Sequence, residues 1–163
     1  MSETKAIVEK KFTPPYKPNL KLFDNTQTNN MIVDKFLSLD FDGVMKEKML
    51  NDINTKNQFG HTALHMACMK DDIERVKILL EAGASLNVQD DKGNTPLMHV
   101  AKKLNVTLVK KLIEYHPDLT IKNSNGKTVM GIMKDIYNEY VHYNEKIKEI
   151  NNIIKILKRG NLE

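Results

Sequence analysis

Residue types recur at an interval of 33 along the middle of this chain. Gly60, Gly93 and Gly126 stand 33 residues apart, and a threonine follows each glycine by two positions. Four pairs of apolar residues keep the same interval: Ile73/Val106, Val76/Val109, Leu79/Leu112 and Leu80/Ile113. A fixed period of this length is typical of repeat architectures, in which each unit buries its apolar face against the next unit. The interval therefore predicts a stack of similar units.

The residues inside one period predict a turn followed by two helices. Thr62 and Thr95 precede short apolar segments, and threonine is a favourable N-cap residue. Pro96 then falls at the first helical position, where its missing N–H costs nothing. The three glycines suit turns that need a positive φ. Helical spacing predicts one buried stripe made of Ile73, Val76, Leu79 and Leu80.

Two kinds of segment resemble a known family. Residues 57–65 and 90–97 resemble the opening motif of the ankyrin repeat, D-x-x-G-x-T-P-L-H, and residues 79–87 are similar to its closing motif, L-L-x-x-G-A-x-x-N. The resemblance covers at least residues 53–133. It implies an all-α ankyrin-repeat solenoid of stacked helix-turn-helix units with β-turn tips. His116 and Pro117 stand where the family places Gly-Ala, so we expect the second repeat to end differently.

The predicted domain organisation has six parts. Residues 1–24 form a flexible basic tail, 25–56 a degenerate N-terminal capping repeat, and 57–89 and 90–122 two ankyrin repeats; residues 123–158 form a C-terminal capping repeat, and 159–163 a short tail. Apolar residues spaced by four and three predict one long helix over 134–158. Its seam consists of Ile136, Tyr140, Tyr143, Ile147, Ile150, Ile154 and Leu157. The seam either caps the stack or joins two copies of the chain.

The family recognises partners through its turn tips and the exposed side of its first helices, which line a concave groove. The resemblance therefore implies a protein-protein interaction module, an adaptor or inhibitor. We call the matching positions the predicted contact surface: Gln58, Phe59, His61, Met69, Lys70, Asp91, Lys92, Asn94, Lys102, Lys103, Ser124, Asn125 and Lys127. With the neighbouring Lys122 they hold six lysines against Asp91, a balance of +5. We expect an acidic partner, with Phe59 and Met69 as apolar anchors.

Other functions find less support in the sequence. The net charge is +4, but arginine, which reads phosphates and base edges best, is scarce. Binding to an anionic surface, nucleic acid or acidic lipid, is the alternative function. The sequence contains no P-loop, G-x-G-x-x-G or G-x-S-x-G motif, and carboxylates such as Asp71, Asp72 and Asp90 stand at turns and helix starts, where they cap N–H groups. We expect no enzyme, no catalytic residue, no cofactor and no small-molecule substrate.

Three histidines and one cysteine are candidate metal ligands. His61, His65, Cys68 and His99 resemble a zinc set, but they include no C-x-x-C pair, and His65 is the family's motif histidine, which hydrogen-bonds backbone groups. We therefore expect no metal site. The chain has no segment apolar enough to span a membrane, and the single cysteine excludes an internal disulfide. The expected location is the cytoplasm, with the nucleus, or a host cell's cytoplasm, as alternatives.

Overall fold

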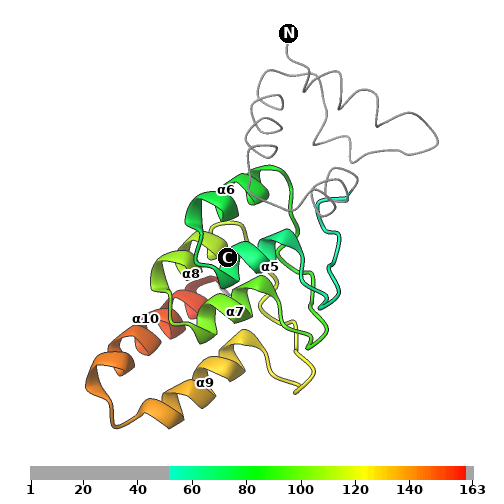
Figure 1. Cartoon of the computed structure of the whole chain (residues 1–163). Coiled ribbons are helices and arrows are strands. Elements are labelled where there is room, and N and C mark those ends of the chain that lie inside the picture. The colour runs from blue at the N-terminus through cyan, green and yellow to red at the C-terminus, as the bar shows by residue number, and fades with distance from the viewer. Residues whose placement is uncertain (1–51, 161–163) are drawn as a thin grey trace, which may run out of the picture.

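A computed structural model describes residues 52–160 of the 163-residue chain. Within this range it contains helices and no strands (Figure 1). The helices, labelled as in Figure 1, are α5 (Ala63–Met69), α6 (Ile73–Glu81), α7 (Pro96–Lys102), α8 (Val106–Ile113), α9 (Val129–Tyr140) and α10 (Asn144–Gly160). The first helices α5, α7 and α9 stack side by side, and each packs against the second helix that follows it. The predicted all-α repeat fold is confirmed.

Threonine caps begin all three first helices. The side chains of Thr62, Thr95 and Thr128 each accept a hydrogen bond from the backbone N–H three residues ahead. Asp72 and Asn105 cap α6 and α8 in the same way. Because each cap satisfies an N–H that the helix itself leaves free, these side chains fix where the helices start. The 33-residue register of the sequence is thus a register of helix caps.

Glycines bring the tips of neighbouring repeats into contact. Gly60, Gly93 and Gly126 have φ angles of +73°, +71° and +70°, as the sequence predicts. A Cβ on Gly60 would lie 2.5 Å from the backbone N of Asp91, so the next repeat approaches too closely for any side chain there. The Asp91 N–H donates to the Phe59 carbonyl at 3.4 Å, and the Ser124 N–H donates to the Lys92 carbonyl at 3.0 Å. The tips are therefore held in one continuous row.

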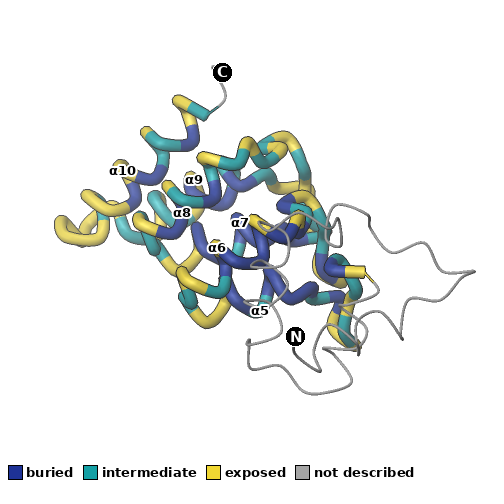
Figure 2. The backbone as a smooth tube through the Cα atoms, turned by 90° about the horizontal axis from the view of Figure 1, so that it is seen from above, coloured by how far each residue is buried: buried dark blue, intermediate teal, exposed yellow. Residues whose placement is uncertain are grey.

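The core runs along the interface between the two helix layers, as Figure 2 shows in dark blue. Val76 and Leu79 are fully buried and Leu80 is also buried, in agreement with the predicted stripe. The stripe is wrong at Ile73, whose side chain is 44% exposed. Ile73 is the first residue of α6, and the helix becomes covered only after its first turn. Val106, the first residue of α8, is likewise only partly buried.

The second repeat ends in a way that the sequence predicted only in part. His116 adopts φ +53°, in the same left-handed region as Gly83 at φ +88°, so the chain leaves α8 much as it leaves α6. The difference lies in one hydrogen bond. The Ala84 N–H donates to the Leu79 carbonyl at 2.9 Å, whereas Pro117 has no N–H to repeat that bond. The conformation is conserved between the two repeats, and one stabilising contact is lost.

The continuous helix predicted over 134–158 is wrong. The chain turns at residues 141–143, and α10 runs back to pack against α8 and α9 (Figure 1). This reversal buries Ile150, Ile153 and Leu157 completely, whereas a straight helix would carry them away from the stack. A long C-terminal helix does exist, but it begins at Asn144 and continues to Gly160, two residues into the predicted tail.

The predicted seam covers the repeat stack. Ile150 and Leu157 are buried, Ile136, Tyr140, Ile147 and Ile154 are partly buried, and only Tyr143 is exposed. Ile153, which lies outside the predicted seam, is buried as well. The capping interpretation therefore fits the contacts of α10, and most of the seam is not free to join a second chain. The predicted tail 1–24, most of the predicted repeat 25–56, and residues 161–163 lie outside the described residues.

Candidate functional site

The predicted contact surface is largely exposed. Eleven of its thirteen residues are exposed to solvent: Gln58, Phe59, Met69, Lys70, Asp91, Lys92, Lys102, Lys103, Ser124, Asn125 and Lys127. They lie on the tips and at the C-terminal ends of α5 and α7, two helices that pack side by side. His61 is only partly exposed. Stacking of the repeats thus brings the tip residues of three repeats onto one side of the molecule.

Asn94 is a correction to this surface, because its side chain is buried rather than exposed. Its Oδ1 accepts hydrogen bonds from Lys102 Nζ at 2.9 Å and Asn123 Nδ2 at 3.2 Å. Its backbone N–H donates to Asp90 Oδ1 at 2.8 Å. These contacts fasten the second tip to the third. Asn94 therefore supports the surface from inside and is not positioned to touch a partner.

Ion pairs reduce the charge of the predicted contact surface. Lys103 pairs with Asp71 and also donates to the Met69 carbonyl at 2.7 Å, and Lys127 pairs with Asp135. Six lysines then face three carboxylates, which leaves +3 rather than the +5 expected from the sequence. The contact with Lys103 also lowers the pKa of Asp71 below its usual value.

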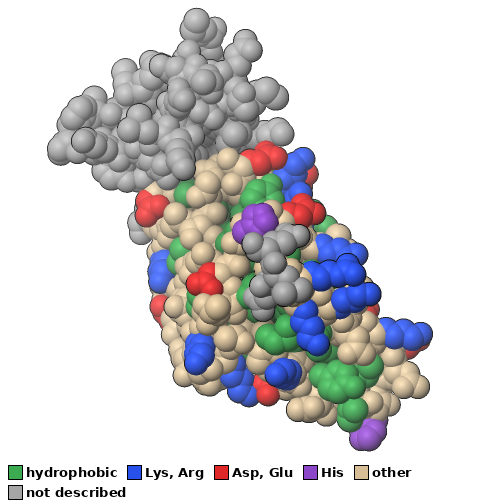
Figure 3. Space-filling model, turned by 180° about the vertical axis from the view of Figure 1, so that it is seen from behind, with side chains coloured by type: hydrophobic (Ala, Val, Ile, Leu, Met, Phe, Trp, Pro, Cys, Tyr) green, Lys and Arg blue, Asp and Glu red, His purple; other side chains and the backbone are tan. Residues whose placement is uncertain are grey.

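Of these six lysines, four have no acidic partner among residues 52–160: Lys70, Lys92, Lys122 and Lys102, whose Nζ donates to Asn94 Oδ1 instead. Lysine is not confined to this side of the molecule, however. Figure 3 shows basic side chains along one edge of the face opposite to that of Figure 1. Positive charge alone therefore does not distinguish the predicted contact surface from the rest of the molecule. The exposed apolar residues of that surface are its second feature.

Two apolar side chains of the predicted contact surface are exposed. Phe59 is 57% exposed and Met69 is 40% exposed, and these are two of the five large apolar residues that the described part of the chain leaves in solvent. Phe59 stands on a tip whose backbone bonds to Asp91, and its ring centroid lies 6.1 Å from that of His61. The backbone that carries this aromatic ring is thus held beside the second tip.

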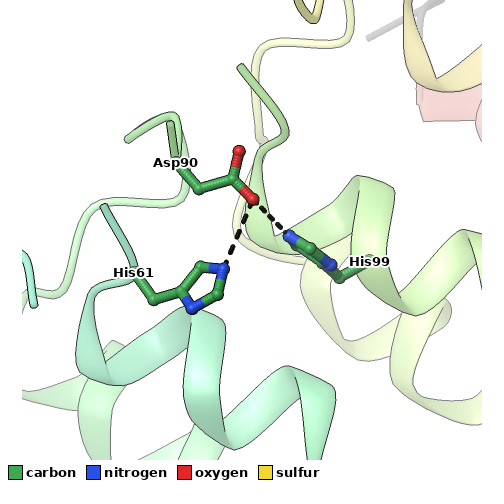
Figure 4. A group of neighbouring side chains, drawn as sticks. All are labelled: His61, Asp90 and His99. Carbon is green, nitrogen blue, oxygen red and sulfur yellow. Dashed lines mark hydrogen bonds and ion pairs between the residues drawn. The ribbon is translucent and has the colours of Figure 1, made fainter. Parts of the chain in front are cut away.

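Figure 4 shows a cluster of three titratable side chains, His61, Asp90 and His99. The ring of His61 is the one that lies next to Phe59. The Asp90 carboxylate points between two imidazoles, with Oδ2 2.7 Å from Nε2 of His99 and 3.6 Å from Nε2 of His61. The ligand atoms of these three side chains all lie within 4.8 Å of one another. Hydrogen bonds from His99 and from the backbone outweigh the effect of burial and keep the pKa of Asp90 below its usual value.

A family model of ankyrin repeats in three copies matches residues 27–130, which is more than half of the chain. The chain is an ankyrin-repeat protein. No curated protein matches it. Ankyrin repeats are in general protein-protein interaction modules, and the family is typically non-catalytic. Along residues 52–160, no helix combines the length and apolarity that crossing a bilayer requires.

The ankyrin histidine, His65, has the structural role that the resemblance implies. Its Nδ1 accepts from the Thr62 N–H at 3.2 Å and contacts Thr62 Oγ1 at 2.9 Å, and its Nε2 donates to the Asn94 carbonyl at 3.1 Å. Burial lowers its pKa to about 4, so the ring is neutral at physiological pH. His65 therefore connects the first ankyrin repeat to the second, and neither of its nitrogens is free to bind a ligand.

The four candidate metal ligands from the sequence, His61, His65, Cys68 and His99, separate into two groups. His61 and His99 come together across the first two repeats. His65 is committed to backbone bonds, and burial raises the pKa of the Cys68 thiol to about 12. Asp90 was missed as a possible ligand. The sequence signal for it is the spacing of nine residues between Asp90 and His99. Asn57 and Met66 have the same spacing and stand 33 residues earlier, and their side chains are also in contact.

Proposed function

We propose that this ankyrin-repeat chain is a non-catalytic adaptor or inhibitor that binds an acidic protein partner through the predicted contact surface. The observation that carries the proposal is the exposed ring of Phe59, fixed on a tip beside the tip of Lys92. Because the backbone of this tip is ordered before binding, contact costs little backbone entropy, and an exposed aromatic ring can contribute strongly to affinity. The family membership supports a protein as the partner.

The lysines would mainly set how fast the partner arrives. Lys70 and Lys92 have no acidic partner among the described residues, and both are exposed. Lys70 follows Met69 in the chain, and Lys92 stands on the tip that is bonded to the tip of Phe59. Attraction between unpaired charges at a surface acts over about one Debye length, roughly 10 Å at 0.1 M salt. It therefore accelerates encounter and weakens as salt is added, whereas the apolar contacts slow dissociation.

The experiment uses the full chain as an affinity ligand, followed by binding measurements on the purified captured protein. Phe59→Ala is expected to weaken binding by about 30-fold, corresponding to about 2 kcal/mol for an apolar hot spot. The double variant Lys70→Glu/Lys92→Glu is expected to slow association, most strongly at low salt. Lys103 is avoided because reversing its charge would also break the pair with Asp71.

A matched control keeps the same total charge change on the other helix layer. Lys77 on α6 and Lys110 on α8 are both exposed, so Lys77→Glu/Lys110→Glu removes as much positive charge as the test variant. Retention of binding by this control, with loss in the two test variants, would support the proposal. Equal binding by all variants would contradict it. Equal weakening by both charge variants would indicate the alternative, a general attraction to anions.

We also propose the cytosol as the place where this function is exercised. The support is the single cysteine, Cys68, a free buried thiol that is compatible with a reducing compartment. A fluorescent fusion of the full chain, viewed in the cell of origin, would test the proposal. Enrichment in the nucleus or in a secretory compartment would contradict it.

A further inference from the structure

We propose that His61, Asp90 and His99 form a binding site for a divalent zinc ion between the first two ankyrin repeats. Two imidazoles and one carboxylate are a ligand set that zinc accepts, with the fourth position left to water or another donor. The three side chains come from two tips and from α7 (Figure 4), so a bound ion would join two repeats. This inference does not depend on the proposed partner.

The spacing of the ligand atoms suits a tetrahedral ion. Zinc–nitrogen and zinc–oxygen bonds near 2.0–2.1 Å place two ligand atoms about 3.3 Å apart. Oδ2 of Asp90 lies 3.6 Å from Nε2 of His61 and 2.7 Å from Nε2 of His99, and all three ligand atoms lie within 4.8 Å of one another. Small side-chain rotations are therefore enough, and no backbone movement is needed. The Nε2 atoms of His61 and His99 both face Oδ2 of Asp90, and the two ring planes stand at 87° to each other.

The ankyrin fold itself does not require this cluster. In the next repeat interface, Asn94, Asn123 and Ile132 occupy the places of His61, Asp90 and His99. At the start of the first repeat, Asn57 and Met66 occupy the places of Asp90 and His99. Both sites have the same turn and the same helix start. The two imidazoles and the carboxylate are thus particular to one interface.

Asp90 has one side-chain oxygen more than the turn requires. Its Oδ1 accepts from the N–H groups of Lys92 at 2.9 Å and Asn94 at 2.8 Å, which closes the turn. Oδ1 of Asn123 closes the third turn in the same way, with N–H groups of Asn125 and Lys127, both at 3.0 Å. An amide oxygen is therefore sufficient for folding. The second oxygen of Asp90 is not needed by the turn, and it is the one directed at both imidazoles.

Neighbouring side chains pack against the ligands, and the site remains accessible to solvent on one side. The ring of His65, fixed by its own hydrogen bonds, lies with its centroid 5.9 Å from His61 and 5.8 Å from His99. The Asp90 side chain is 1% exposed, whereas those of His61 and His99 are 19% and 18% exposed, so solvent reaches the imidazole side. The 2.7 Å contact places the His99 proton on Nε2 facing Asp90. Ligation through Nε2 moves that proton to Nδ1, and the ion takes its place.

The test is calorimetric titration of Zn²⁺ alone into the full, chelator-treated chain. We expect one ion per chain. The test variants place at each ligand position a residue that the fold already carries in another repeat: His61→Asn, Asp90→Asn and His99→Met. Each is expected to weaken zinc binding by about 100-fold or more, since loss of even an outer-shell contact costs 10–100-fold. The control is His142→Asn, which alters an exposed histidine outside the cluster and should bind as the unaltered chain does.

Two further measurements keep a negative result interpretable. Urea unfolding without zinc should show that the three variants remain folded, because their new residues already occupy equivalent positions. X-ray absorption at the zinc edge should show nitrogen and oxygen neighbours and no sulfur. Absence of zinc binding, equal affinity in all variants, or a sulfur neighbour from Cys68 would each overturn the site.

Discussion

At the residue scale, the repeat is a pattern of backbone angles that persists where the residue type changes. Gly83 and His116 stand 33 residues apart and share a left-handed backbone. Asp71 and Leu104 do the same, with φ of +56° and +60° in the loops between paired helices. Residues other than glycine are strained there, because their Cβ meets the following carbonyl. Packing of the repeats therefore imposes a positive φ on residues that intrinsically disfavour it, such as Leu104 and His116.

Gly93→Ala should destabilise the protein more than Gly126→Ala. Both glycines have φ near +70°, so each alanine is expected to cost about 1–2 kcal/mol in backbone strain. A Cβ at Gly93 would in addition lie 2.7 Å from the backbone N of Ser124, whereas a Cβ at Gly126 has no atom within 4 Å. Separating the two tips should add at least 1 kcal/mol by the cost typical of overpacking. Urea unfolding measures both variants, and equal losses would contradict the close contact between tips.

His116→Gly should stabilise the protein. The exposed His116 holds φ +53°, and glycine removes the strain of that angle while adding some freedom to the unfolded chain. The net gain is expected to be about 0.5–1 kcal/mol. His116→Ala is the control, because it removes the same side chain but keeps the strain. Thermal unfolding would contradict the argument if both variants changed the melting temperature equally.

Acid should destabilise the fold through His65. Its folded pKa is about 4 against 6.5 for the ordinary group, so the unfolded state takes up the proton first. The stability is complete above pH 6.5 and is lost as the pH falls from 6.5 toward 4, by about 2 kcal/mol at pH 5. The pKa of His99, lowered by burial, acts in the same direction.

Urea unfolding at pH 7.5 and pH 5 checks this dependence. His65→Gln should be less stable than the unaltered chain at pH 7.5 but should lose less stability on going to pH 5. His142→Gln, at an exposed position, should keep the original dependence. An unchanged pH dependence in His65→Gln would assign the effect to other groups.

At the element scale, the caps of the repeats were predictable and the reversal before α10 was not. Thr62, Thr95 and Thr128 act through their immediate neighbours, so local sequence reveals them. The turn at 141–143 has no glycine or proline to mark it. Its cause is distant, since only a reversed α10 can bury Ile150 and Ile153 against the stack. Periodicity gives the apolar face of a helix but not the direction in which the helix returns.

The candidate site shows the same division. Exposure of tip residues such as Phe59 and Lys92 follows from the repeat register and was predicted correctly. Burial of Asn94 was missed because it depends on Lys102 and Asn123, one of which belongs to the next repeat. The contact of Asp90 with the two histidines was missed for a similar reason. Its role in capping N–H groups is local and was expected, whereas its second oxygen faces His61 and His99, which belong to two different repeats.

Ile153→Ala should therefore cost far more than Tyr143→Ala. Ile153 is fully buried in α10, and removing such a side chain typically costs about 2–5 kcal/mol. Tyr143 is 64% exposed at the turn, so its truncation should change the stability by about 0.5 kcal/mol or less. Urea unfolding distinguishes them. Similar small losses in both would mean that α10 does not pack on the stack in solution.

At the scale of the whole molecule, residues 52–160 form a row in which the main contacts between helices join neighbouring repeats. In such a row the end units matter more than their length suggests, because they cover an apolar surface that no further repeat will cover. Here α10 covers α8 and α9. Its last residue, Gly160, packs so closely that a Cβ added there would lie 3.1 Å from the Ile113 side chain. The whole stack should thus depend on a segment that lies beyond the residues matched by the family model.

Removal of α10 tests this dependence directly. A chain ending at His142 loses Ile150, Ile153 and Leu157, each worth about 1.5–3 kcal/mol when fully buried, and leaves the surface they covered in water. Part of that loss is offset because 18 fewer residues, from 143 to 160, have to be ordered. The remaining loss of several kcal/mol is comparable to the total stability of a small domain, about 5–15 kcal/mol. We expect the chain ending at His142 to lose cooperative unfolding at 25 °C in circular dichroism, while a chain ending at Gly160 unfolds like the full chain. Cooperative unfolding of the shorter chain at the original urea midpoint would show that the stack closes without α10, and the buried isoleucines would then need another explanation.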